Sequence, residues 1–230
     1  MVTNSNAPLP YEEDVQESEK LHAVQLYPQN ISISNIPRTP KGHEQFAATF
    51  LASPQQKSYP SKPSSGTQEL SRETELQWDP IPTATILICG HNSRDTRCGI
   101  LGPLLAREFK KSVFDPALLK REDLFTNARA DEIAFQQLQQ SDRPPASVAL
   151  ISHIGGHAFA GNVVIYIPRT WRVMGRSGGL SPLAGKGVWY GRVEPRHVWG
   201  IVEETVKGGR VIGKLLRGIC TPEEGGDGGG

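Results

Sequence analysis

The chain has 230 residues and a formal net charge of +1 at pH 7. So small a net charge gives no overall field that would attract nucleic acid or an acidic membrane surface. No apolar run approaches the roughly 18–20 residues that a membrane-spanning helix needs, so we expect neither a nucleic-acid partner nor membrane insertion.

The first 78 residues are rich in Ser, Pro, Gln and Lys, as in LASPQQKSYPSKPSSGTQELSRETE. Only LHAVQLY and FAATFLA look able to contribute to a core, and so little apolar surface cannot offset the entropy of ordering the chain. We therefore expect residues 1–78 to be a largely disordered or shortened segment. The acidic start MVTNSNAPLPYEEDVQESEK has neither the apolar core of a secretory signal nor the Arg-rich character of a mitochondrial presequence.

Residues 79–219 have the pattern of one compact domain of ordinary size. TATILICG (83–90) predicts a buried strand that ends at glycine. GILGPLLAREFKK (99–111) has apolar residues at helical spacing, and we expect this helix to start near 101–103 because Pro103 fits only the first turn. ADEIAFQQLQQ (130–140) predicts a second helix.

The second half of this domain contains more strands than the first. Apolar runs predict strands over 147–152, 162–168 and 187–193. EPRHVWGIVEETVKGG (194–209) predicts a helix with Pro just inside its start and Gly-Gly after its end. We expect RVIGKLLRG to continue this helix after a break, and residues 220–230 to be a flexible tail.

The predicted element order is strand, helix, helix, strand, strand, strand, helix. A short spacer between residues 152 and 162 favours antiparallel pairing of the later strands. This order is typical of a thioredoxin-like α/β fold, in which helices flank a mixed sheet.

Three cysteines, Cys89, Cys98 and Cys220, argue against a disulfide scaffold and favour a reducing compartment. The loop CGHNSRDTRCGILG has no C-x-x-C motif, so dithiol exchange by this loop is not expected. A phosphatase cradle is excluded, because Asp95 stands where the sixth-position arginine should be and would repel a phosphate.

Two histidines follow the strand at 147–152 in SHIGGHAFAGN. His153 and Cys89 both lie at strand carboxyl ends, so their loops meet if the strands are neighbours. Cys98 and His157 would lie on the turns that follow. Two thiolates and two imidazoles suit either one zinc ion or a [2Fe-2S] cluster. The eight residues between the cysteines are wide for one ion and easier for two irons.

The same residues have purely structural interpretations. Cys89 at a strand end can serve as a small hydrophobic side chain, and both histidines can be hydrogen-bonded core residues. Glycines 155, 156 and 161 fit either tight backbone geometry or close approach of the chain to a cofactor. His197 is expected to be structural or exposed.

Three segments, ILICGHNSRDTRCGILGPLL, SHIGGHAFAGNVVIYIP and WYGRVEPRHVWGIVEETVKGGRVI, resemble the sucrase/ferredoxin-like family. The resemblance covers about residues 83–218. It implies a thioredoxin-like ferredoxin domain that binds a [2Fe-2S] cluster through Cys89, Cys98, His153 and His157. It also implies a mitochondrial location, with the cytoplasm as the alternative. Family members usually carry a longer N-terminal half. We find no carboxylate pair of the glycosidase kind that would support sucrase activity.

The resulting prediction is an iron–sulfur redox protein, an electron carrier or redox sensor rather than a catalyst with its own substrate. No flavin or nicotinamide motif is visible, so we expect an external redox partner. A zinc-stabilised or metal-free interaction module is the alternative. A thiol oxidoreductase that uses Cys220 with Cys89 or Cys98 is a third interpretation, and it requires Cys220 to reach the other two.

Overall fold

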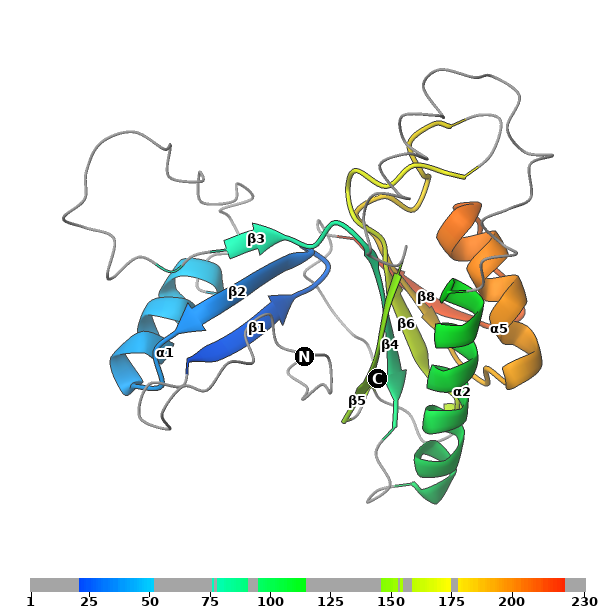
Figure 1. The fold of residues 1–230 in the computed structure, drawn as a ribbon, viewed down its shortest axis with the longest axis horizontal. Helices are drawn as coiled ribbons and strands as arrows, with labels where there is room; N and C mark the ends of the chain where they lie inside the picture. The colour runs from blue at the N-terminus through cyan, green and yellow to red at the C-terminus, as the bar shows by residue number, and fades with distance from the viewer. Residues whose placement is uncertain are drawn as a thin grey trace. The chain divides into compact units, whose positions relative to one another are not determined.

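A five-stranded mixed sheet with the strand order β5-β4-β6-β7-β8 dominates the computed structural model (Figure 1). The structure describes residues 21–51, 76, 78–90, 95–114, 146–152, 154, 159–174 and 178–221. The five strands are β4 (Ala84–Cys89), β5 (Ala146–Ile151), β6 (Val163–Tyr166), β7 (Gly187–Tyr190) and β8 (Leu216–Cys220).

The sheet has one parallel pair, β4 with β5, and its other neighbours are antiparallel. Helix α2 (Thr96–Phe114) follows β4, and α5 (Pro195–Ile201) follows β7. A central β4 flanked by a parallel β5 and an antiparallel β6–β7 hairpin is the thioredoxin-like arrangement, so the predicted fold class is confirmed. The strands predicted over 83–90, 147–152, 162–168 and 187–193 are confirmed as β4 to β7, whereas the helix predicted over 130–140 lies outside the described residues.

The two faces of the sheet bury different clusters. One face packs against α2 and α5, which Figure 1 shows on the same side of the sheet. The other face carries a second cluster that includes Leu87, Val164 and both Cys89 and Cys98. Because both faces are covered, every residue of β4 is buried, which explains its continuous apolar run ATILIC.

Helix α2 begins at Thr96, so the start predicted near residues 101–103 was wrong. Asp95 provides the start. Its carboxylate accepts a hydrogen bond from the Arg97 N–H (2.9 Å), and its carbonyl accepts one from the Cys98 N–H (3.1 Å). An Asp in this position satisfies N–H groups of the first turn. Pro103 is therefore inside the helix, where it removes one intrahelical hydrogen bond.

The helix after β7 is confirmed: α5 starts at Pro195 and continues as a π-helical segment, η5 (Val202–Lys207), which ends before Gly208. The predicted helical continuation over RVIGKLLRG was wrong, because Leu216–Cys220 forms β8. Gly213 and Gly218 weaken a helix at this point. The free edge of β7 supplies hydrogen-bonding partners for a strand instead.

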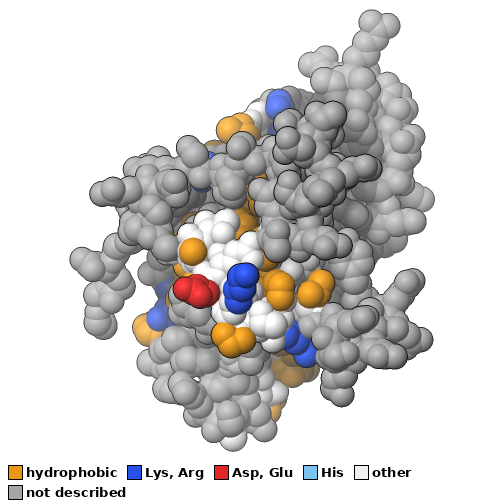
Figure 2. All heavy atoms as spheres, turned by 90° about the vertical axis from the view of Figure 1, so that its left-hand side faces the viewer, with side chains coloured by type: hydrophobic (Ala, Val, Ile, Leu, Met, Phe, Trp, Pro, Cys, Tyr) orange, Lys and Arg blue, Asp and Glu red, His pale blue; other side chains and the backbone are white. Residues whose placement is uncertain are grey.

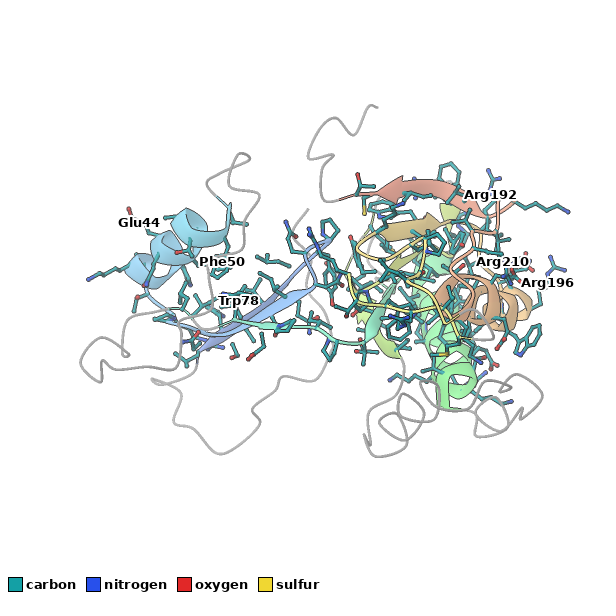
Figure 3. The ribbon with its side chains drawn as sticks, turned by 90° about the horizontal axis from the view of Figure 1, so that it is seen from above. Glu44, Phe50, Trp78, Arg192, Arg196 and Arg210 are labelled. Carbon is teal, nitrogen blue, oxygen red and sulfur yellow. The ribbon has the colours of Figure 1, made fainter. Side chains whose placement is uncertain are left out.

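A second compact unit lies in the N-terminal part of the chain. Its strands β1 (His22–Leu26), β2 (Ile31–Ile36) and β3 (Trp78–Pro80) form an antiparallel sheet in that order. A helix, α1 (Pro40–Phe46), continues as the π-helical segment η2 (Ala47–Leu51). Figure 3 shows Phe50 of η2 beside Trp78, and both pack on a cluster of buried isoleucines.

These described residues form regular elements where the composition led us to expect disorder. HAVQL and FAATFL contribute to the unit as their apolar character suggests. The missed strand is ISISNI, whose Ile31, Ile33 and Ile36 are buried while the intervening Ser and Asn residues give the segment a polar composition. The turn Tyr27–Asn30 belongs to the larger unit, where the Tyr27 ring stacks on Tyr166 at 4.3 Å.

The described surface is mixed in character on the face that Figure 2 shows. Hydrophobic side chains stand apart from one another there, and basic and acidic side chains lie among them. Within the described residues, no helix is both long enough and apolar enough to cross a membrane.

Candidate metal centre

Cys89 is the last residue of β4 and is buried, with an exposed fraction of 1%. It pairs with Ile151, the last residue of β5. Its N–H donates to the carbonyl of Asn162 (3.1 Å), and the next N–H, of Gly90, donates to the Ile151 carbonyl (3.1 Å). The backbone of Cys89 is thus fixed from both neighbouring strands, which holds its side chain in one place.

Two glycines let α2 come close to the end of β4. A Cβ on Gly102 would lie 2.7 Å from both the Cys89 carbonyl oxygen and the Gly90 Cα, so no side chain fits at this contact. Cys98 precedes Gly102 by four residues, so the two residues lie on the same face of α2. The contact at Gly102 therefore directs Cys98 towards Cys89.

The two thiols are neighbours. A hydrogen bond joins their side chains, and Cys98 is buried like Cys89, with an exposed fraction of 3%. Burial first, and then the neighbouring Cys89 thiol, raise the pKa of Cys98 to about 11. In the protein alone the Cys98 sulfur is consequently a protonated thiol at neutral pH, and a bound metal would displace that proton.

A glycine with a positive φ places a backbone group on the second sulfur. The backbone of Gly161 hydrogen-bonds Cys98 in the sense that favours the thiolate. Gly161 has a φ of +84°, and a Cβ there would meet the Val193 carbonyl oxygen. Its own carbonyl accepts a hydrogen bond from the Val193 N–H (3.1 Å). Of the two interpretations of this glycine, tight backbone geometry is therefore the one that the structure bears out.

The charged residues of the loop before α2 have a structural role. Arg97 donates two hydrogen bonds to the Asp95 carboxylate, at 2.8 and 3.1 Å, and Asp95 also receives the first-turn N–H. His197 likewise accepts a hydrogen bond from the Glu194 N–H (3.1 Å) at the start of α5, as its structural interpretation predicted.

The structure does not describe His153 or His157, so the histidine half of the predicted ligand set lies outside the described residues. Within the described part of the chain, no group of three or more His, Cys, Asp or Glu side chains gathers to hold a metal ion. Two of the four predicted ligands, Cys89 and Cys98, are brought together.

The described residues on either side of the histidines do touch the cysteines. Ile151 pairs with Cys89, and Ile154, which follows His153 directly, is buried in the same cluster as both thiols. At the other end, Gly161 hydrogen-bonds Cys98.

Cys220 lies far from the other two cysteines. It pairs with Gly187, which pairs with Tyr166. Tyr166 pairs in turn with Thr85, four residues before Cys89. At about 4.8 Å per strand and 3.3 Å per residue, Cys220 is roughly 14 Å across the sheet and 13 Å along it from Cys89. A disulfide needs Cα atoms within about 7 Å, so the folded sheet rules out the Cys220 thiol exchange considered above.

Two residues of this site were missed from the sequence. Gly102 lies in GILG directly after Cys98, and its spacing of four from that cysteine was the available signal. Asn162 follows Gly161 and is 2% exposed. Its contact with Cys89 depends on pairing between distant strands, which no local pattern shows.

Comparison with known proteins gives one family. The model of the sucrase/ferredoxin-like family matches residues 1–218. Two similar curated relatives are named altered inheritance of mitochondria protein 32. The one from Debaryomyces hansenii is 34% identical over 205 residues, covering 85% of this chain and 59% of the relative. The one from Meyerozyma guilliermondii is also 34% identical, covering 86% and 56%. The chain thus spans less than two thirds of the length of these relatives.

Among solved structures, the chain is similar to a thioredoxin-like [2Fe-2S] ferredoxin from Aquifex aeolicus. One structure of that protein is 16% identical, covers 61% of this chain and 96% of its own, and has a TM-score of 0.36. A wild-type structure at 17% identity covers 59% and 97%, with a TM-score of 0.35.

Proposed function

Because the chain belongs to the sucrase/ferredoxin-like family, we propose that it is a redox protein that holds a [2Fe-2S] cluster. The proposed ligands are Cys89, Cys98, His153 and His157. When bound, such a cluster carries one electron at a time, which suits either electron transfer or redox sensing. The relatives' names do not state a cofactor, so the proposal depends on the donor residues of this chain.

The observation that carries the proposal is the hydrogen bond between the Cys89 and Cys98 thiols. Two soft sulfur donors, adjacent and buried, are what iron–sulfur and zinc centres require. A cysteine that serves only as a small apolar side chain does not require a second thiol in contact with it. The pair therefore fits the proposed group in both the type and the position of its donors.

The course of the chain supports the histidine ligands. The connection from Ile151 to Gly161 begins at a residue paired with Cys89 and ends at one that hydrogen-bonds Cys98. His153 and His157 both belong to this connection. Ile154, the residue after His153, belongs to the same buried cluster as both cysteines, and neighbouring Cα atoms are 3.8 Å apart.

The surrounding residues would tune the group. The hydrogen bond from the Gly161 backbone stabilises negative charge on the Cys98 sulfur. Leu87, Ile151 and Ile154 belong to the same buried apolar cluster as both cysteines. Hydrogen bonds to the sulfurs and exclusion of solvent are two of the factors that set the reduction potential of such centres.

The same two thiols also suit a single zinc ion, which would make the chain a zinc-stabilised interaction module. The eight residues between Cys89 and Cys98 had argued against one ion. The Gly102 contact brings Cys98 towards Cys89 in spite of that spacing, so the spacing no longer disfavours zinc.

Metal analysis separates the two candidates. We expect anaerobically purified protein to contain iron and acid-labile sulfide in equal amounts, with about two of each per chain. It should be reddish-brown and give an electron paramagnetic resonance signal after reduction. Colourless protein with one zinc and no sulfide would replace the cluster with the zinc module. Protein with neither metal would leave only the metal-free interpretation.

We further propose a mitochondrial location and an external redox partner. The support is the name that the relatives share, altered inheritance of mitochondria protein. Fractionation of cells that express a tagged chain tests the location, and recovery outside the mitochondrial fraction would contradict it.

A further inference from the structure

Two arginines lie on the ring of Phe159, two residues before Gly161. The guanidinium carbon of Arg217 is 4.2 Å from the centroid of the Phe159 ring, and that of Arg192 is 5.1 Å away. Each contact is a cation–π interaction. Arg217 also donates a 2.7 Å hydrogen bond to the Asn162 side-chain oxygen. Residues from three separate segments thus bring two positively charged side chains to the same ring.

The backbone around these arginines is adapted to them. Gly191 is buried, and a Cβ there would lie 2.7 Å from Cδ of Arg217 and 3.2 Å from Cβ of Phe159. Arg192 has a φ of 57°, a left-handed conformation that costs a non-glycine residue about 1–2 kcal/mol. Strained residues of this kind gather at functional sites. With this backbone conformation, the Arg192 guanidinium lies over the Phe159 ring, which Arg217 also contacts.

The two charges are not compensated within the described structure. The ion pairs there join other basic residues to acids, and Glu194, the acid nearest to Arg192 in sequence, is paired with Arg196 at 2.8 Å. Both Arg192 and Arg217 are exposed. Two like charges on one ring repel each other, and an external anion would relieve this repulsion.

The arginine pair is connected to the candidate centre through four residues. Residues 159–162 carry the Phe159 ring at one end and the Asn162 carbonyl, which binds the Cys89 N–H, at the other. Gly161 between them hydrogen-bonds Cys98. A partner bound at the ring is therefore bound next to the residues that hold both thiols.

We propose that Arg192 and Arg217, held on Phe159, form the docking surface for a redox partner that presents clustered carboxylates. The partner's redox character rests on the proposed function, whereas the surface is defined without any cofactor. A protein partner fits better than a small anion, because one exposed ion pair contributes only about 0–1 kcal/mol. Several carboxylates on one surface can engage both arginines at once. Figure 3 labels Arg192 near β8, on which Arg217 lies.

The binding test needs no cofactor. We would titrate the ¹⁵N-labelled full chain with a decaglutamate peptide and follow the nuclear magnetic resonance spectrum. We expect shifts centred on residues 159–162, 191–193 and 217. Affinity should fall severalfold between about 0.01 and 0.15 M salt, as the Debye length shrinks from about 30 to 8 Å.

Matched variants make the test specific. The double variant R192Q/R217Q should lose roughly fivefold or more in affinity for the peptide. R107Q removes another exposed arginine, from α2, and should change the affinity less than twofold. R192K/R217K keeps the charges and should retain most of the binding. Equal affinity of R192Q/R217Q and R107Q, or shifts located elsewhere, would overturn the proposal. Binding of inorganic pyrophosphate as tightly as the peptide would replace it with a small-anion site.

A second measurement links the surface to electron transfer. After iron and sulfide have been assayed, reduced protein is oxidised by ferricyanide, an anion, or by hexaammineruthenium(III), a cation. The ferricyanide rate should fall severalfold in R192Q/R217Q, while the ruthenium rate stays equal or rises. Equal ferricyanide rates would contradict the docking role. Wild-type protein without iron would instead contradict the proposed function, and the peptide titration would still decide on the surface.

Discussion

Cys98 lies one helical turn before Gly102, the residue through which α2 touches the end of β4. The position of the second thiol therefore depends on a residue that has no side chain. This relationship can be tested without changing either cysteine.

Replacing Gly102 with alanine should separate the thiols. The new Cβ would lie 2.7 Å from two backbone atoms, which cannot move aside as a flexible side chain can. We expect a loss of about 1–3 kcal/mol in the free energy of unfolding and weaker metal retention. Urea unfolding and metal analysis measure both. Gly200 in α5 is the matched control, because a Cβ there meets nothing within 4 Å. Its alanine variant should gain about 0.5–1 kcal/mol. Two variants of equal stability would refute the steric argument.

Replacing either site cysteine with serine should remove most of the bound iron. Serine keeps the size of the side chain but replaces the soft thiolate with a poor iron ligand. Cys220→Ser is the control: its sulfur lies at the far end of the sheet, against Tyr166 and Trp189, so this variant should keep its iron. Full iron content in both Cys89→Ser and Cys98→Ser would disprove the ligand assignment, and loss of iron in Cys220→Ser would disprove the site's location.

Removing the metal should lower the melting temperature. A group that ties the end of β4 to the start of α2 binds only the folded state, so it stabilises that state by mass action. Differential scanning calorimetry of protein before and after anaerobic chelation measures the change. The double variant Cys89→Ser, Cys98→Ser should show no shift under the same treatment. An unchanged melting temperature in the wild type would mean that the metal does not contribute to the fold.

Alkaline pH should destabilise the larger unit through its tyrosines. Burial raises the pKa of Tyr27 to about 12 and also raises the pKa values of Tyr166 and Tyr190. An unfolded tyrosine ionises near pH 10. Above that pH the folded chain keeps protons that the unfolded chain has lost, so the free energy of unfolding falls.

Absorbance at 295 nm should show at least three of the five tyrosines ionising above pH 10. Tyr27→Phe loses the 3.0 Å hydrogen bond to Thr85, which costs about 1 kcal/mol at neutral pH. The variant should lose less further stability than the wild type between pH 9 and 11. An identical pH dependence of the two proteins would show that Tyr27 does not contribute.

The sequence correctly predicted the strands that are buried along most of their length. Strands β4, β6 and β7 are buried apolar runs bounded by Gly or Pro, so their own residues specify them. The sequence did not predict strands whose formation depends on pairing with another strand. Edge strand β8 exists because β7 has a free edge. Strand β2 was missed for another reason: its isoleucines alternate with polar residues, which is a strand pattern, but the polar composition of the segment led us to expect disorder.

The start of α2 was a different kind of error. The predicted start relied on Pro103 alone, but a proline can remain inside a long helix at the loss of one hydrogen bond.

For the candidate centre, the sequence predicted which residue types are present but did not predict how they contact one another. Cys89 at a strand end and Cys98 near a helix start follow from local pattern. That their sulfurs touch depends on Gly102 meeting Gly90, and the Gly161 contact depends on Val193. These contacts join positions far apart in the chain, so periodicity contains no information about them.

The central position of β4 has a consequence for the order of folding. Strands β6, β7 and β8 follow one another as antiparallel neighbours within residues 163–220, whereas β4 pairs with strands that begin at residues 146 and 163. Contacts that close longer loops cost more chain entropy and form more slowly. The meander β6-β7-β8 should therefore form first, and β4 with its two cysteines should join it late. A metal ion that needs Cys89 and Cys98 together would then be captured only by chains that have nearly finished folding.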